Sequence, residues 1–128
     1  MSSDAISALK RGVLGLLVQC LAPVAVFDGV PRGANAPWVS FGDTKALDVS
    51  GLGARIWEVD VMLDVWSQQP GSGEALAIAG NMARALHHAL LPLDGHAMLD
   101  GRIISLDTTR EDDWQRVRLT WRAVVREV

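Results

Sequence analysis

The 128-residue chain has little of what marks several large protein classes. It contains one cysteine, Cys20, so an intrachain disulfide is excluded and nothing calls for an oxidising compartment. Its 12 lysines and arginines are outnumbered by 15 aspartates and glutamates, for a net charge of −3. Because a sequence-independent grip on phosphate backbones needs a cationic excess, we expect no dedicated nucleic-acid binder.

Long apolar runs are also missing. The best candidate for a membrane or export element, Val13–Phe27, is interrupted by Gln19 and Pro23 and is too short to span a bilayer. Asp4 would lie in the positively charged region of a signal peptide, which argues against export. We therefore expect neither membrane insertion nor secretion.

Catalytic and cofactor motifs are absent as well. The chain has no GxSxG, HExxH, P-loop or GxGxxG pattern. His87 and His88 are adjacent, so on a helix they point about 100° apart and cannot share a metal ion. Cys20 lies among leucines, where a small buried hydrophobe is expected. We predict no catalytic residue, no metal site and no cofactor.

What the chain does contain suits one packed domain over residues 1–128. Hydrophobic residues make up 49% and charged residues 21%, as in soluble globular proteins. Apolar residues from Ile6 to Cys20 recur at three- and four-residue steps, which predicts a helix that ends near Cys20 or Leu21, before Pro23. Ser2 or Ser3 can cap its start.

A second helix is predicted to begin at Glu74, where a carboxylate suits the positive end of the helix dipole. Its apolar stripe runs from Ala75 to Ala89 or Leu90, and Pro92 ends it. Both helices thus have one apolar side that must be buried against another element.

Period-two alternation predicts two long strands. From Arg55 to Trp66 and from Trp114 to Val125, apolar residues alternate with mostly charged ones, with Met62, Thr120 and Val124 among the uncharged exceptions. Shorter strands are predicted at Trp38–Gly42 and Arg102–Asp107, with Thr44–Gly53 as a long loop or extended hairpin arm and Thr108–Asp113 as a polar turn. The predicted fold is α+β, with a mainly antiparallel four-stranded sheet and two helices packed on one face.

The two long strands differ in the charge of their polar faces. The first carries carboxylates and the second carries arginines at the same two-residue step; these are Glu58, Asp60 and Asp64 against Arg116, Arg118 and Arg122. Carboxylates so placed could serve acid–base chemistry, but pairing with the arginines is the simpler interpretation. Pairing within one chain and pairing between subunits explain the alternation equally well.

Three runs, in this order along the chain, resemble a known family. They are VFDGVP at Val26–Pro31, PWVSFGD at Pro37–Asp43, and WEVDVMLDVWSQQPGSGEALAIAGNMARAL at Trp57–Leu86. Together they are similar to the tail terminator, or tail completion, family of long-tailed phages and gene transfer agents. The C-terminal hairpin is similar in arrangement more than in residues.

The resemblance implies a structural protein of a virion or virus-like particle tail, assembled in the host cytoplasm. Copies would form a ring, usually hexameric, that stops polymerisation of the major tail tube protein. The ring would join the tail to a head-side connector or stopper protein. DNA would pass through the lumen without specific binding, and no reaction would be catalysed.

On that basis we predict a subunit interface that uses the hairpin arm, the charged strand faces and the C-terminal turn. Its candidate residues are Lys45, Leu47, Asp48, Leu52, Glu58, Asp60, Asp64, Asp112, Asp113, Arg116, Arg118 and Arg122. Two alternatives stay open: a small α+β enzyme or ligand-binding domain, and another ring component of a contractile or secretion-type tube.

Overall fold

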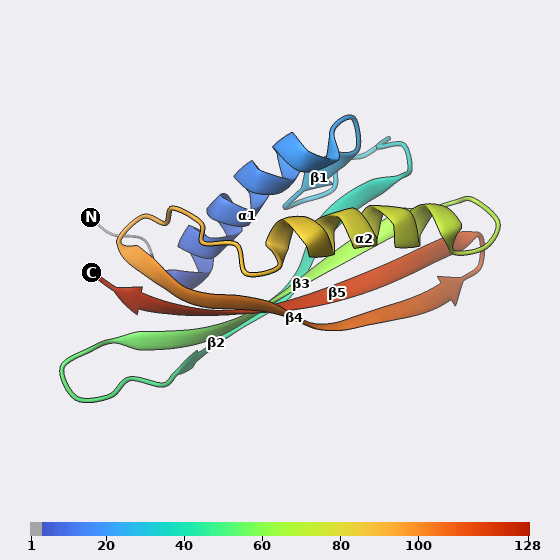
Figure 1. Ribbon diagram of the computed structural model, residues 1–128. Coiled ribbons are helices and arrows are strands. Elements are labelled where there is room, and N and C mark those ends of the chain that lie inside the picture. Colours follow the sequence, from blue (N-terminus) through green and yellow to red (C-terminus); the bar gives the residue numbers. More distant parts are fainter. Residues whose placement is uncertain (1–3) are drawn as a thin grey trace.

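A computed structural model describes residues 4–128 as two helices and a five-stranded sheet (Figure 1). The elements, in chain order, are α1 (Ala5–Leu21), β1 (Ala25–Phe27), β2 (Trp38–Asp48), β3 (Ile56–Ser67), α2 (Gly73–Leu86), β4 (His96–Glu111) and β5 (Trp114–Glu127). None of the helices within residues 4–128 is long and apolar enough to cross a membrane.

The sheet has the strand order β1-β2-β3-β5-β4 and is mixed, which corrects the prediction of four strands. The additional strand, β1, runs parallel to β2 and pairs Ala25 with Trp38; every other pairing is antiparallel. β1 has only three residues and lies in a segment rich in Gly and Pro. Such a short strand is paired by its tertiary context and shows no alternation of its own.

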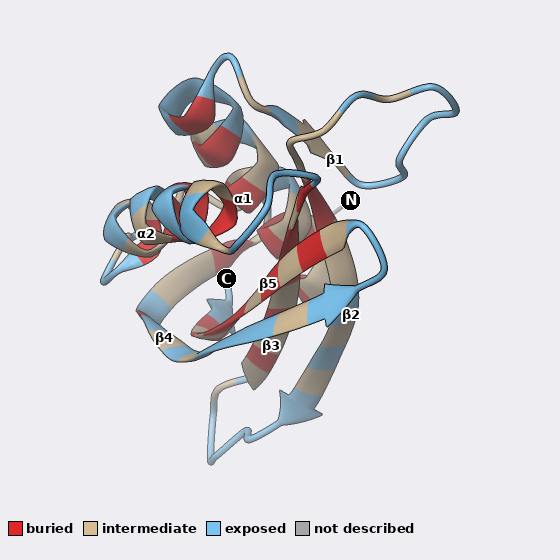
Figure 2. Ribbon diagram, turned by 90° about the vertical axis from the view of Figure 1, so that its right-hand side faces the viewer, coloured by how far each residue is buried: buried red, intermediate tan, exposed pale blue. Residues whose placement is uncertain are grey.

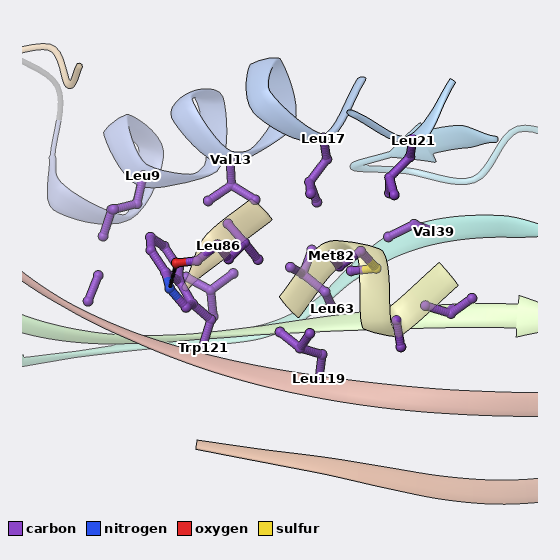
Figure 3. Packing of buried hydrophobic residues seen from close by; sticks show 14 of the residues in the cluster. Leu9, Val13, Leu17, Leu21, Val39, Leu63, Met82, Leu86, Leu119 and Trp121 are labelled. Carbon is purple, nitrogen blue, oxygen red and sulfur yellow. Dashed lines mark hydrogen bonds between the residues drawn. The ribbon is translucent and has the colours of Figure 1, made fainter. Parts of the chain in front are cut away.

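Both helices lie over the same face of the sheet, as predicted (Figure 1). Leu9, Val13 and Leu17 point from α1 toward the sheet, and Met82 and Leu86 of α2 lie between α1 and the strands (Figure 3). The predicted stripe of each helix is therefore its buried side, except for Cys20 of α1. The sheet contributes the inward residues of β3 and β5, which are Val59, Val61, Leu63, Val65, Val117, Leu119, Trp121, Ala123 and Val125.

The first helix begins one residue after Asp4, whose carboxylate accepts a hydrogen bond from the Ser7 backbone N–H at 2.8 Å. This side chain satisfies one of the unpaired N–H groups of the first turn. The predicted caps Ser2 and Ser3 lie outside the described residues. The helix ends at Leu21, as predicted.

The second helix ends at Leu86, six residues before Pro92, so the prediction that it runs on to Ala89 or Leu90 is wrong. The Trp121 indole N–H donates to the Leu86 carbonyl at 3.2 Å (Figure 3), and His88 adopts a left-handed conformation with φ 53°. A left-handed residue stops helix propagation. The termination depends on a tryptophan 35 residues away, which local sequence does not reveal.

Two further boundaries differ from the prediction. β2 continues to Asp48, so the first half of Thr44–Gly53 is one side of an extended hairpin arm with β3, the second of the two predicted alternatives. β4 has 16 residues rather than the predicted Arg102–Asp107, and only Asp112 and Asp113 remain in the turn before β5. Cys20 is exposed, not buried as expected, although Leu17, one turn before it on α1, is fully buried.

Candidate functional site

The side of the sheet away from the helices, here called the outer face, carries the charged residues that the alternation predicts. On β3 and β5 every second side chain points to the core, so Glu58, Asp60 and Asp64 share the outer face with the three arginines. No helix within residues 4–128 covers this face (Figures 1 and 2). It is therefore a candidate contact surface.

Acidic and basic residues of the outer face pair with each other within the chain. Asp64 lies directly opposite Arg118, which donates from Nε and Nη2 at 2.8 and 3.0 Å. Asp60 lies opposite Arg122, which donates in the same forked way at 2.8 and 3.1 Å. Glu58 adds a contact of 3.4 Å to Arg122. Of the two modes left open by the sequence, pairing within the chain is present.

The ion pairs shift the pKa values of Asp60, Arg118 and Arg122. Hydrogen bonds from Arg122 lower the pKa of Asp60 against the opposing effect of burial. The hydrogen bonds with Asp64 raise the pKa of Arg118, and those with Asp60 raise the pKa of Arg122. Asp60, Arg118 and Arg122 are therefore held in their charged forms. The side chains stay partly open to solvent, except Asp64, whose side chain is 7% exposed.

Arg116 does not join this set of ion pairs. It lies opposite Trp66 on β3, and its guanidinium carbon is 5.6 Å from the centre of the Trp66 ring. Its Nε is buried and has no hydrogen-bond partner among the described residues. The predicted strip of three equivalent arginines thus divides into two paired members and one that stacks on an indole.

The remaining predicted residues lie at two opposite ends of the outer face. Lys45 lies opposite Asp60 on β2, while Leu47, Asp48 and Leu52 belong to the hairpin arm. Asp112 and Asp113 form the β4–β5 turn, beside the other end of β3. The structure therefore does not bring the arm and this turn together within one chain.

A cluster of three tryptophans on the outer face was missed by the sequence analysis. The ring centres of Trp38 and Trp114 are 5.1 Å apart, and those of Trp66 and Trp114 are 6.0 Å apart. Together with Val30 and Ser40 they line a mostly apolar hollow. The sequence did contain the information needed to find it. Trp66 and Trp114 lie an even number of residues from the charged residues of their strands, which places them on the outer face.

The histidines do not form a metal site. Nδ1 of His88 lies 3.5 Å from a carboxylate oxygen of Asp100, and Nδ1 of His96 lies 2.9 Å from the Asp94 carbonyl oxygen. Within residues 4–128, no group of three or more His, Cys, Asp or Glu side chains could hold a metal ion.

Comparison with known proteins finds one matching family and one similar solved structure. Residues 16–126 match the family described as Tail completion protein gp17. A chain in the solved structure "Virion of native gene transfer agent (GTA) particle" has a TM-score of 0.84 and 25% identity, over 97% of this chain and 99% of that one. No curated protein matches significantly. These findings confirm the resemblance seen in the sequence: the chain belongs to the tail completion protein gp17 family.

Proposed function

We propose that the protein is a structural component of a phage-like or gene-transfer-agent tail. Copies form a ring, usually a hexamer, at the head-proximal end of the tail, where they stop tube polymerisation and join the tail to the head-side connector. The observation that carries this proposal is the near-complete match of the fold to a chain of a gene transfer agent virion. The family match over residues 16–126 supports it independently.

The electrostatics of the chain suit a passage for DNA. A net charge of −3 gives no counterion-release affinity for a phosphate backbone. The outer-face carboxylates and two of the three arginines neutralise each other. A lumen built from such subunits would let DNA pass without holding it.

We place the subunit interface on the outer face and its two ends. A cyclic head-to-tail contact needs two different complementary patches on each subunit. The candidate residues predicted from the sequence supply them: the arm at one end, and Arg116 with Asp112 and Asp113 at the other. Asp60, Asp64, Arg118 and Arg122 then stiffen the face between these ends, and their exposed edges contact the neighbour.

Deletion of the gene, followed by electron microscopy of the particles, tests the function. We expect long tail tubes of uncontrolled length without heads, and tails of normal length joined to heads when the wild-type gene is restored. Heads joined to tails of normal length in the deletion strain would contradict the proposal.

A tagged copy distinguishes the terminator from the alternative ring component. Gold labelling of the tag should mark one position per particle, at the junction of head and tail. Label at the distal end or along the whole tube would assign the protein to another part of the tail.

A further inference from the structure

The tip of the β2–β3 arm carries an apolar knob, Leu52, which is fully exposed. Two further apolar residues of the same arm, Leu47 and Val49, are about half exposed (51% and 41%). The turn is ordered by local bonds: Ser50 donates its backbone N–H to the Asp48 carboxylate at 2.8 Å, and the Ile56 N–H donates to the Ser50 hydroxyl at 3.0 Å. Exposed apolar residues on an ordered protrusion are typical of a contact site.

The opposite end of the outer face carries an apolar hollow of about 330 Å³. Its walls are the three clustered tryptophans, with Val30 and Ser40 completing the lining. Rigid aromatic walls of this kind favour anchoring contacts, because they bury a large area at little cost in side-chain entropy.

A positive charge lies beside the hollow. The guanidinium carbon of Arg116 is 5.6 Å from the centre of the Trp66 ring, which lines the hollow, and the residue is only half-buried. Arg116 has no ion-pair partner among the described residues that would neutralise it. The arm carries the carboxylate of Asp48, whose charge complements that of Arg116.

The knob and the hollow cannot meet within one chain. β2 begins at Trp38 in the hollow and ends at Asp48 in the arm, and ten residue steps of about 3.3 Å separate these residues by roughly 30 Å. A second copy can bring them together. Since the two patches differ, the contact repeats head to tail and can close into a ring.

We propose that the arm tip of one subunit docks in the tryptophan hollow of the next, with Leu52 as the anchor and with the Asp48 carboxylate of the incoming arm beside Arg116. This inference rests on the proposed function and defines the contact that builds the ring. It identifies the occupant of the hollow as a second copy of this chain.

Cysteine cross-linking in assembled particles tests the contact. In a Cys20→Ser background, Val30→Cys places a thiol at the hollow and Leu52→Cys places one at the tip. Treatment with a short bis-maleimide should give a ladder of dimers and larger multimers that stops at the ring size. The two single-cysteine variants are the controls and should give no ladder.

The outcomes separate this inference from the proposed function. If the double variant joins heads to tails but remains monomeric after treatment, the docking contact is wrong and the tail function stands. If the tagged protein is absent from the junction of head and tail, the proposed function itself fails.

A second variant avoids dependence on cross-linking geometry. Leu52→Asp replaces a fully exposed side chain, so the protein should fold normally, while the yield of joined particles should fall at least tenfold. Leu90→Asp, at another exposed leucine outside the arm and the hollow, is the matched control and should leave the yield unchanged. A normal yield with Leu52→Asp would overturn the proposal.

Discussion

Asp64 and Arg118 are 54 residues apart in sequence, yet they face each other across β3 and β5 and share two hydrogen bonds of 2.8 and 3.0 Å. The Asp64 side chain is nearly buried, while the Arg118 side chain is 30% exposed. Asp43 and Asp107 also lie close enough to raise the pKa of Arg118. One arginine therefore compensates three carboxylates at the centre of the outer face.

This arrangement predicts unequal effects of removing the two partners. Arg118→Ala leaves the buried Asp64 carboxylate without its partner and should lower the free energy of unfolding by about 2–3 kcal/mol. Asp64→Asn leaves the arginine with two other acidic neighbours and should cost less. Urea unfolding followed by circular dichroism measures both.

Arg118→Lys is the matched control, since it keeps the charge but loses the forked geometry and should lie between wild type and Arg118→Ala. Equal losses for Arg118→Ala and Asp64→Asn would show that Asp43 and Asp107 do not interact with this arginine.

The Asp60–Arg122 pair predicts a dependence of stability on pH. Hydrogen bonds from Arg122 hold the pKa of Asp60 in the folded protein below its usual value of 3.8. The carboxylate therefore stabilises the fold above that value, and this contribution is lost as the pH falls through the lower folded-state pKa. Asp60→Asn should be less stable than wild type near neutral pH, and the difference should shrink in acid below 3.8.

Arg122→Gln removes the other partner, so its deficit should fade over the same acidic range. Urea midpoints measured at several pH values compare the variants with wild type. A deficit of Asp60→Asn that is the same at neutral and acidic pH would contradict the role assigned to this pair.

The fold was most predictable where its pattern is regular. β3 and β5 are long and central, and each buries one face under the helices, so their alternation was visible and also placed the charges correctly. The ends of α2 and β4 could not be predicted from the local sequence. The last turn of α2 is bonded to Trp121, and the length of β4 follows from its pairing with β5. Local sequence does not specify contacts between distant segments.

Glycines at 101 and 80 predict effects of opposite sign. A Cβ at Gly101 would lie 2.8 Å from the Trp121 ring and 3.0 Å from the Met98 methyl carbon, so Gly101→Ala should destabilise the fold by about 1–3 kcal/mol. Gly80 lies inside α2 and has only the end of the Arg84 side chain within 4 Å, at 3.9 Å. Gly80→Ala should stabilise by about 0.5–1 kcal/mol.

Thermal unfolding of the two variants checks this pair, with Gly80→Ala as the control for the alanine substitution itself. A melting temperature for Gly101→Ala at or above that of wild type would show that the β4–β5 hairpin can shift to accommodate the methyl group without loss of stability.

The exposed thiol predicts free reactivity in the folded state. Cys20 lies on the solvent side of α1, so one thiol per chain should react with Ellman's reagent without denaturant. Cys20→Ser should change the free energy of unfolding by less than about 0.5 kcal/mol, as is usual for surface substitutions. A thiol that reacts only after denaturation would place it in the core, as the sequence pattern had suggested.

The candidate site was predictable in its residue types but not in its pairing. Parity along the strands assigns the carboxylates, the arginines and two tryptophans to one face. Whether Asp64 faces Arg118 or Arg116 depends on the β3–β5 register, and a shift of two residues would keep every side chain on its face. Only the three-dimensional contacts select one register.

The irregularity of β4 has a consequence for the free subunit. β4 is an edge strand of 16 residues, and its pairing with β5 shifts register after Met98 and again after Ile103. A straight edge of that length would be a template for fibril growth, whereas bulges bend an edge away from such pairing. The distortions that hid this strand from the sequence pattern therefore protect newly made copies from aggregation while they await incorporation.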